Sequence, residues 1–278
     1  MNQTLHDSAL LLRVDGVTVR FGGLTAVNNV SFDVHQGDLL GLIGPNGAGK
    51  TTMLRSIIGV ARPTVGRVLL GGESLNDLPI HQRIRRGLSL SQQLVRPLRE
   101  INVIENVALA AASAKTSSPW KSLLHASSAD ELAVAAQELK RVGIAAMADQ
   151  SPTVQPLGVL KRLELARALA LKPRLLLLDE PLAGLNSREA RELANTIAEI
   201  NQQGLTIVLI EHNLGEVMRI CRRLVVLDNG KKIGEGEPRA VMADPVVRAA
   251  YLGGDALGAA AAEGQAAQPS TPKEASHA

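Results

Sequence analysis

The sequence is poor in cysteine and in aromatic residues, and each shortage excludes a class of protein. Cys221 is the only cysteine among 278 residues, so an internal disulfide or a cluster of thiolate metal ligands is excluded. Aromatic residues make up 1% of the chain and are Phe21, Phe32, Trp120 and Tyr251. So few rings argue against a platform that stacks the bases of single-stranded nucleic acid. We expect Cys221 to be a small buried apolar residue.

Long hydrophobic runs and strong net charge are also missing. No apolar stretch approaches the roughly 20 residues that cross a bilayer, and residues 1–8 lack the basic segment that opens a secretory signal. Any membrane association is therefore expected to be peripheral. The formal net charge is only +3, and we expect no nucleic-acid partner. A cluster of arginines could form a basic patch, but a solvated helix face is the favoured interpretation; its members are Arg83, Arg85, Arg86, Arg96 and Arg99.

A glycine-rich segment over residues 44–51 matches every specified position of the phosphate-binding loop G-x-x-x-x-G-K-[ST]. An apolar run of strand length precedes it and a helix-forming pattern follows it, which argues against an accidental glycine-rich turn. Lys50 is expected to meet the β- and γ-phosphates of a nucleotide, and the Thr51 hydroxyl to ligate Mg²⁺. The predicted nucleotide-binding residues here are Gly44, Pro45, Asn46, Gly47, Ala48, Gly49, Lys50, Thr51 and Thr52.

Two further segments place chemically active side chains after apolar runs. Four leucines end at Asp179 and Glu180, so Asp179 is a candidate Mg²⁺ ligand and Glu180 a candidate general base. The alternative is that these acids cap a turn before Pro181. His212 follows an apolar run over 205–210 and is predicted to reach a γ-phosphate, although a lone histidine is more often structural.

The hydrophobic pattern predicts an α/β fold. Alternation predicts strands over residues 11–20 and 30–43, with turn residues at 22–23 and 36–38, and a shorter strand over 65–72. Continuous apolar runs predict strands buried on both faces, which together with intervening helices indicate a parallel sheet; these runs cover residues 175–178, 205–210 and 224–227. We therefore predict a P-loop core with a parallel sheet and an antiparallel β subdomain toward the N-terminus.

Apolar spacing of three and four residues predicts an inserted helical subdomain near residues 96–158. Within it, a Ser-, Ala- and Lys-rich stretch over 113–129 is expected to be a loop with one helical turn around Trp120. We assign residues 9–254 to one nucleotide-binding domain. Residues 255–278, rich in Ala, Gly, Gln, Ser and Pro, are predicted to be a disordered tail.

With these motifs, the chain resembles the ATP-binding cassette (ABC) ATPases, and within them the branch that serves uptake of branched-chain and other hydrophobic amino acids. Residues 21–27 resemble the adenine-stacking A-loop, with Phe21 as the aromatic. Residues 91–100 resemble the Q-loop, residues 182–186 the D-loop with Asn186 where many relatives have Asp, and residues 210–213 the switch region. The resemblance implies that Gln93 touches Mg²⁺ and the attacking water and moves with the permease.

The resemblance implies an ATP-hydrolysing subunit of an importer, with ATP and Mg²⁺ bound. Two cassettes would sandwich ATP, attached to transmembrane permease subunits at the cytoplasmic face of the cell (inner) membrane. A periplasmic or extracellular substrate-binding protein would take part indirectly. Two other functions stay open: a soluble ABC ATPase not tied to transport, and a regulatory cassette that hydrolyses weakly.

One element departs from the family pattern. The ABC signature is close to Leu-Ser-Gly-Gly-Gln, and residues 155–159 here read Gln-Pro-Leu-Gly-Val, so only Gly158 is retained. In the family the signature serine donates to the γ-phosphate held by the opposite subunit. Pro156 has neither a hydroxyl nor an N–H group for that purpose. We therefore expect a heterodimer in which the partner cassette supplies an intact signature.

Overall fold

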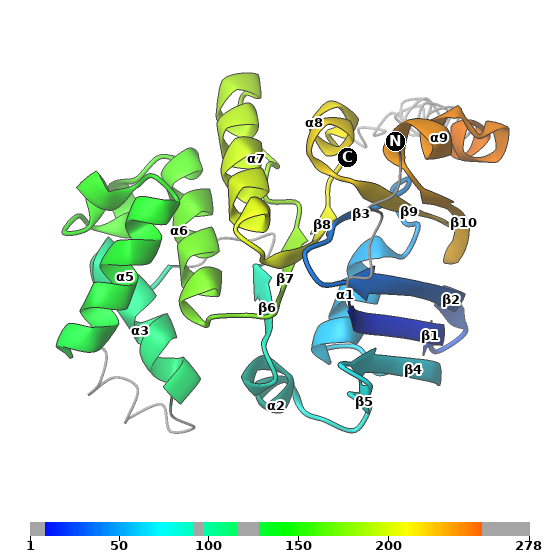
Figure 1. Cartoon of the computed structure of the whole chain (residues 1–278), viewed down its shortest axis with the longest axis horizontal. Coiled ribbons are helices and arrows are strands. Elements are labelled where there is room, and N and C mark those ends of the chain that lie inside the picture. The colour runs from blue at the N-terminus through cyan, green and yellow to red at the C-terminus, as the bar shows by residue number, and fades with distance from the viewer. Residues whose placement is uncertain (1–8, 92–96, 116–127, 252–278) are drawn as a thin grey trace, which may run out of the picture.

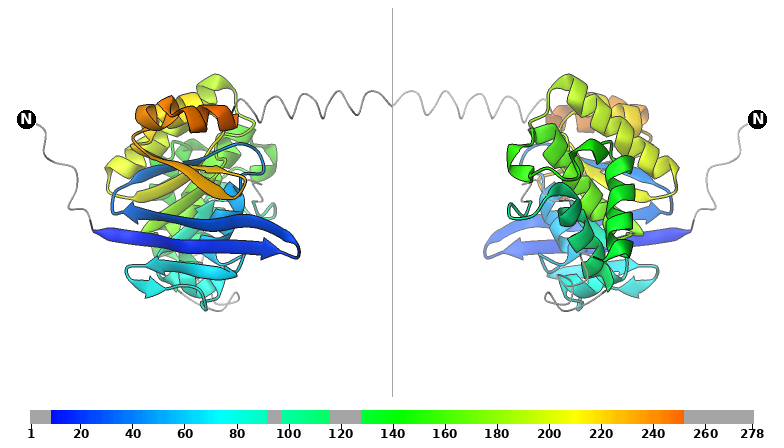
Figure 2. Two further views of the ribbon diagram at one scale, coloured as in Figure 1. Left: turned by 90° about the vertical axis from the view of Figure 1, so that its right-hand side faces the viewer. Right: turned by 90° about the vertical axis from the view of Figure 1, so that its left-hand side faces the viewer.

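The computed structural model describes residues 9–91, 97–115 and 128–251, which form two β-sheets with helices packed between and around them (Figure 1). A four-stranded antiparallel sheet has the order β2-β1-β4-β5. Its two long strands lie across one end of the molecule (Figure 2). The strands are β1 (Leu10–Phe21), β2 (Leu24–His35), β4 (Val65–Leu70) and β5 (Glu73–Ser74). The antiparallel subdomain predicted near the N-terminus is thus present.

A six-stranded sheet forms the centre of the molecule, in the order β10-β9-β3-β8-β7-β6. Five of its strands are parallel, and β10 pairs with β9 in the antiparallel sense. This arrangement confirms the α/β class. The strands are β3 (Leu39–Ile43), β6 (Leu88–Ser91), β7 (Leu175–Asp179), β8 (Thr206–Ile210), β9 (Arg223–Asp228) and β10 (Lys231–Gly236).

The parallel strands are continuous apolar runs because both faces of their sheet are covered. Successive side chains of a strand point to opposite faces. Leu175 and Leu177 accordingly join the core shared with the antiparallel sheet and α1, whereas Leu176 and Leu178 join the core formed with the helices on the other face. All four leucines are fully buried. Asp179 is the last residue of β7 and therefore lies at the carboxyl end of the strand.

Helices surround the central sheet, and α3, α5 and α6 contact one another at the end of the molecule away from the antiparallel sheet (Figures 1 and 2). Of these helices, α3 and α5 lie within the predicted helical subdomain near residues 96–158, whereas α6 continues beyond it. The helices are α1 (Lys50–Ile58), α2 (Ile80–Arg85), α3 (Val103–Lys115), α5 (Ala129–Arg141), α6 (Leu157–Ala170), α7 (Ser187–Gln202), α8 (Leu214–Ile220) and α9 (Pro238–Ala243), with single 3₁₀ turns at Ala145–Met147 and Pro152–Val154. Residues 245–251 are also helical.

The structure corrects two sequence predictions. Residues 30–43 are not one strand: β2 ends at His35, a turn through Gly37 with φ 79° follows, and β3 enters the other sheet. Arg83 does not lie on a solvated helix face, because it is 2% exposed and its guanidinium donates to the carbonyls of Ser56 and Ile57 at 2.8 Å. Arg83 thus caps the end of α1, where the last carbonyls of a helix lack intrahelical partners.

Cys221 is a buried free thiol, as predicted, and burial raises its pKa to about 12. Three predictions concern residues outside the described ranges: Gln93, the loop around Trp120, and the tail over 255–278. Across the described part of the chain, no helix combines the length and the apolar character that crossing a bilayer requires.

Candidate functional site

The loop between β3 and α1 folds around the side chain of its own lysine. Lys50 is 5% exposed, and its Nζ donates to the carbonyl oxygens of Gly44 at 2.7 Å and Pro45 at 2.9 Å. Burial lowers the pKa of Lys50, while the carboxylates of Glu180 and Asp179 act in the opposite direction. A cation held in this position faces the concave side of a loop whose following helix begins at residue 50.

Close backbone contacts explain why glycine occupies this loop. A Cβ at Gly44 would lie 2.0 Å from the Leu227 carbonyl oxygen, and a Cβ at Gly49 would lie 2.4 Å from that of Ala26. Both residues also have positive φ, at 147° and 97°. Within the described residues, α1 has no side-chain cap, so the N–H groups of its first turn face the cleft as anion-binding donors.

A turn that the sequence analysis did not assign to the site supports the P-loop from the side. The Gly230 N–H donates to the Ala48 carbonyl at 3.1 Å, and the Gly230 carbonyl accepts from the Asn28 N–H at 2.7 Å. Asn229 and Gly230 both have positive φ and connect β9 to β10. Asn-Gly directly after an apolar strand is a hairpin signal, so sequence reasoning could have found the turn, although not its contact with the loop.

Thr51 and Asp179 meet at the carboxyl end of β7. The Thr51 hydroxyl donates to Asp179 Oδ1 at 3.3 Å. Burial, followed by repulsion from Glu180, raises the pKa of Asp179, and the Thr51 hydrogen bond acts against that rise. A hydroxyl beside a buried carboxylate is an all-oxygen donor set, which is the chemistry that Mg²⁺ prefers. The predicted metal ligands Thr51 and Asp179 therefore fit the ion; Gln93 lies outside the described residues.

Glu180 and His212 form a direct pair, although 32 residues separate them. His212 Nε2 lies 2.9 Å from Glu180 Oε1, with the histidine side chain 44% exposed and the glutamate side chain 15% exposed. Glu180 has φ 52°, a left-handed conformation that is uncommon for a residue other than glycine. Such backbone outliers persist where surrounding contacts over-determine them, and they concentrate at functional sites.

These elements line one cleft of about 460 Å³, a volume in the range of ligand pockets, roughly 300–1,000 Å³. The structure therefore brings together the predicted Phe21, the loop from Asn46 to Thr52, Glu180 and His212. Phe21 is 54% exposed at the end of β1, so its ring is free to stack on a base. Lining residues that the sequence analysis missed are Leu24, Thr25, Ala26, Asn229 and Gly230.

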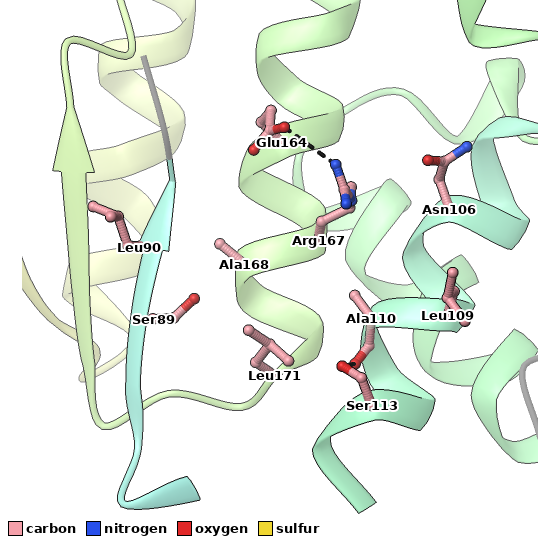
Figure 3. A pocket seen from close by; sticks show the side chains of 10 residues that line it. All are labelled: Ser89, Leu90, Asn106, Leu109, Ala110, Ser113, Glu164, Arg167, Ala168 and Leu171. Carbon is pink, nitrogen blue, oxygen red and sulfur yellow. Dashed lines mark hydrogen bonds and ion pairs between the residues drawn. The ribbon is translucent and has the colours of Figure 1, made fainter. Parts of the chain in front are cut away.

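A second cleft opens between β6 and the helices α3 and α6 (Figure 3). Its wall carries an ion pair, with Arg167 Nη1 3.2 Å from Glu164 Oε1, beside apolar side chains that include Leu109 and Leu171. None of its described lining residues belongs to the P-loop or follows β7. This cleft is therefore separate from the phosphate-binding one.

The segment at residues 155–159 begins α6. Pro156 occupies the N-cap position, and within the described residues no side chain caps this helix end. Val154 and Leu157 are 75% and 42% exposed, so the tip of α6 presents apolar side chains. Pro156, which lacks a polar donor, therefore lies directly before the first turn of α6.

The fold and the cleft define a P-loop nucleoside triphosphatase, with phosphate donors and acidic residues at the carboxyl edge of a parallel sheet. Residues 27–183 match the family model for ABC transporters, and residues 231–256 match a model for branched-chain amino acid ATP-binding cassette transporters. The chain belongs to the ABC transporter family, and it is an ATP-binding and ATP-hydrolysing cassette.

Known proteins resemble most of the chain. It is 40% identical over 249 residues to the high-affinity branched-chain amino acid transport ATP-binding protein LivG of Escherichia coli (strain K12), covering 87% of this chain and 98% of LivG. The crystal structure of the ADP conformation of MJ1267, an ABC transporter cassette, is 30% identical with a TM-score of 0.80, covering 88% of this chain and all of MJ1267. A dimeric structure of the bacterial cassette MJ0796 is 25% identical with a TM-score of 0.71, covering 82% and 99% of the two chains.

Proposed function

We propose that this chain energises an importer of branched-chain or related amino acids, bound to a permease at the cytoplasmic face of the cell membrane. The observation that carries the proposal is that the similarity to LivG spans 98% of that protein, together with the separate match of residues 231–256 to the branched-chain amino acid cassettes. That segment includes β10 and α9, outside the ATP-hydrolysing core.

The chemistry follows from the cleft. Lys50 and the N–H groups at the start of α1 bind the β- and γ-phosphates, and Phe21 stacks on adenine. Thr51 and Asp179 would hold Mg²⁺, which would neutralise phosphate charge when bound. Glu180 orients and deprotonates the attacking water, while His212, 2.9 Å from it, fixes the carboxylate and faces the γ-phosphate. Gln93 is proposed as a further contact to Mg²⁺ and the water.

The test is isolation of the native complex from membranes, followed by reconstitution in vesicles with ATP inside. Leucine uptake that depends on ATP, and that Lys50→Ala removes, would support the importer. A complex that lacks any transmembrane subunit would favour a soluble ABC ATPase instead. Absence of ATP turnover in the complete complex would favour a regulatory cassette.

We also propose that the permease contacts the cleft between β6, α3 and α6 (Figure 3). The strand β6 leads directly into the Q-loop segment, which in the resembling family moves with the permease. The cleft combines apolar side chains with the Glu164–Arg167 pair, a surface suited to a helix that carries both apolar and polar groups. Ser113→Trp would fill it. We expect this variant to lose co-purification with the permease while keeping its affinity for ATP; retained co-purification would contradict the assignment.

The second cassette is proposed to be a different chain. Pro156 cannot donate a hydroxyl to the nucleotide of a partner, so two copies of this chain would have two weakened sites. A partner with an intact signature completes the cleft built on Lys50 and Glu180. Native mass spectrometry of the purified complex tests this: one copy of this chain with one other cassette is expected, and two copies of this chain would contradict it.

A further inference from the structure

The backbone of Glu180 is held from both sides by residues distant in sequence. Its N–H donates to the Ile210 carbonyl at 3.0 Å, where β7 passes β8. Its carbonyl accepts a hydrogen bond from Lys161 Nζ at 3.0 Å. Lys161 lies in the second turn of α6 and is 6% exposed. A non-glycine residue at φ 52° needs such external contacts, because the left-handed conformation is otherwise unfavourable.

A second buried residue ties the segment after Glu180 to the segment that carries His212. Glu211 is 4% exposed. Its Oε1 accepts from the Leu182 N–H at 2.6 Å, and its Oε2 accepts from the His212 N–H at 3.1 Å. One carboxylate thus bridges two loops that the parallel sheet brings to the same edge. Hydrogen bonds to a charged acceptor of this kind are among the stronger ones in proteins.

Glu211 also acts electrostatically on Lys161. Burial lowers the pKa of Lys161, and the Glu211 carboxylate is the foremost charge that opposes this shift. Burial likewise raises the pKa of Glu211, against the hydrogen bonds it accepts from backbone N–H groups. Burial disfavours the charged form of each side chain, and the nearby partners oppose that effect, since an isolated buried ion would be costly.

We infer that Glu211 and Lys161 are positioning residues for ATP hydrolysis. They hold Glu180 and His212 in the correct position relative to the γ-phosphate. The inference rests on the proposed role of Glu180 as general base. Neither side chain lines the nucleotide cleft, so they act through the backbone of residues 180–182 and of His212. An error of about 1 Å in the position of a base can cost on the order of 100-fold in turnover.

The test is Glu211→Gln in the full complex, with kcat, KM and ATP affinity measured separately. The amide keeps the volume but replaces one accepting oxygen with an NH₂ group that faces a backbone N–H. We expect kcat to fall at least about tenfold, with ATP affinity within about twofold of wild type, because the phosphate cradle is untouched. Glu216→Gln is the matched control: Glu216 is a buried acid on α8 paired with Arg219, and its removal should leave kcat unchanged.

Further variants separate positioning from general destabilisation. Lys161→Arg keeps a charged donor and should recover most of the kcat that Lys161→Met loses. In a Glu180→Gln background, Glu211→Gln should cause no additional loss, since its effect passes through the base. If Glu211→Gln does not fold, Glu211→Asp, which keeps the charge but cannot span both N–H groups, takes its place in the same assays.

Wild-type kcat for Glu211→Gln or Glu211→Asp, or a loss of ATP affinity equal to the loss of kcat, would overturn the inference. A wild-type complex without ATP turnover would instead contradict the proposed function, so the two failures are distinguishable.

Discussion

The cleft at the carboxyl edge of the parallel sheet and the tip of α6 are the two regions that we propose contact ATP, and they differ sharply in polarity. In the cleft, Lys50 donates to the Gly44 carbonyl, the Thr51 hydroxyl donates to Asp179, and Glu180 contacts His212. At the tip of α6, Pro156 takes the N-cap position and the neighbouring Val154 and Leu157 expose apolar surface. One region is densely polar; the other presents little that could bind a phosphate through side chains.

From this difference we propose that the chain supplies the groups that bind and hydrolyse its own ATP but contributes weakly to the site of its partner. The two functions are physically separable, because the cleft is built on the central sheet whereas the tip belongs to the helical subdomain. Substitutions in the two regions should therefore produce different kinetic signatures in one complex.

The largest effect is expected from Glu180→Gln. Removing a general base typically costs about 10²- to 10⁴-fold in kcat. The phosphate cradle is unchanged, so ATP binding should persist and a nucleotide-bound dimer should accumulate. Single-turnover hydrolysis and size-exclusion chromatography with ATP measure both outcomes. Glu199→Gln, on the exposed face of α7, is the control. Near-wild-type turnover would show that Glu180 is not the base.

Lys50→Ala should mainly lower the affinity for ATP. The variant loses charge-assisted hydrogen bonds to phosphate worth about 3 kcal/mol, which corresponds to roughly 100-fold in affinity. Isothermal titration with ATP measures this loss. Lys140→Ala, an exposed position on α5, should bind ATP as the wild type does. Equal affinities of the Lys50 and Lys140 variants would contradict the assignment of the P-loop lysine.

Asp179→Asn should separate metal binding from folding. We expect ATP affinity in Mg²⁺ to fall at least about tenfold, toward the value seen in EDTA. The raised pKa of Asp179 indicates that its charged form is costly in the folded protein at neutral pH, so the nucleotide-free variant should melt at a higher temperature than wild type. A lower Tm together with unchanged Mg²⁺ dependence would count against the site.

Pro156→Ser should give the smallest effect, a gain. Serine restores the hydroxyl and is a good N-cap residue. It should therefore stabilise the start of α6 and strengthen phosphate binding in the partner's site. We expect total ATPase activity of the complex to rise by no more than about twofold, because the repaired site would at most equal the one that is already competent. Pro156→Ala restores only the N–H group and serves as the control. An equal gain from alanine would assign the effect to the backbone rather than to the hydroxyl.

Much of this site could be predicted from the sequence, because its main elements are short contiguous segments of the chain. The P-loop is contiguous, and Asp179 and Glu180 follow a run of leucines whose burial on both faces the structure confirms. Strands β7, β8 and β9 were predicted on the same grounds. The parallel sheet then necessarily brings their carboxyl ends together.

The remainder depends on contacts between distant segments. Strand β6 was not predicted, because its sequence Leu-Ser-Leu-Ser lacks the continuous apolar run that identified other strands of this sheet. The structure nevertheless buries Ser89 and Ser91. Likewise, the sequence shows Glu211 and Lys161 as two charged residues on separate elements, and only the fold brings them to residues 180–182. Residues 30–43 were assigned to one strand because hydrophobicity does not report a change of sheet.

The most direct test of the account compares the same substitution in the two cassettes of the purified transporter. In the proposed heterodimer, Glu180→Gln in this chain would remove the base from the site that the partner's intact signature completes, whereas the equivalent change in the partner would remove it from the site that Pro156 weakens. The account predicts that the first change nearly silences ATP hydrolysis and transport, and that the second costs much less. Equal losses from the two substitutions, or brisk hydrolysis by this chain alone as a homodimer, would contradict it.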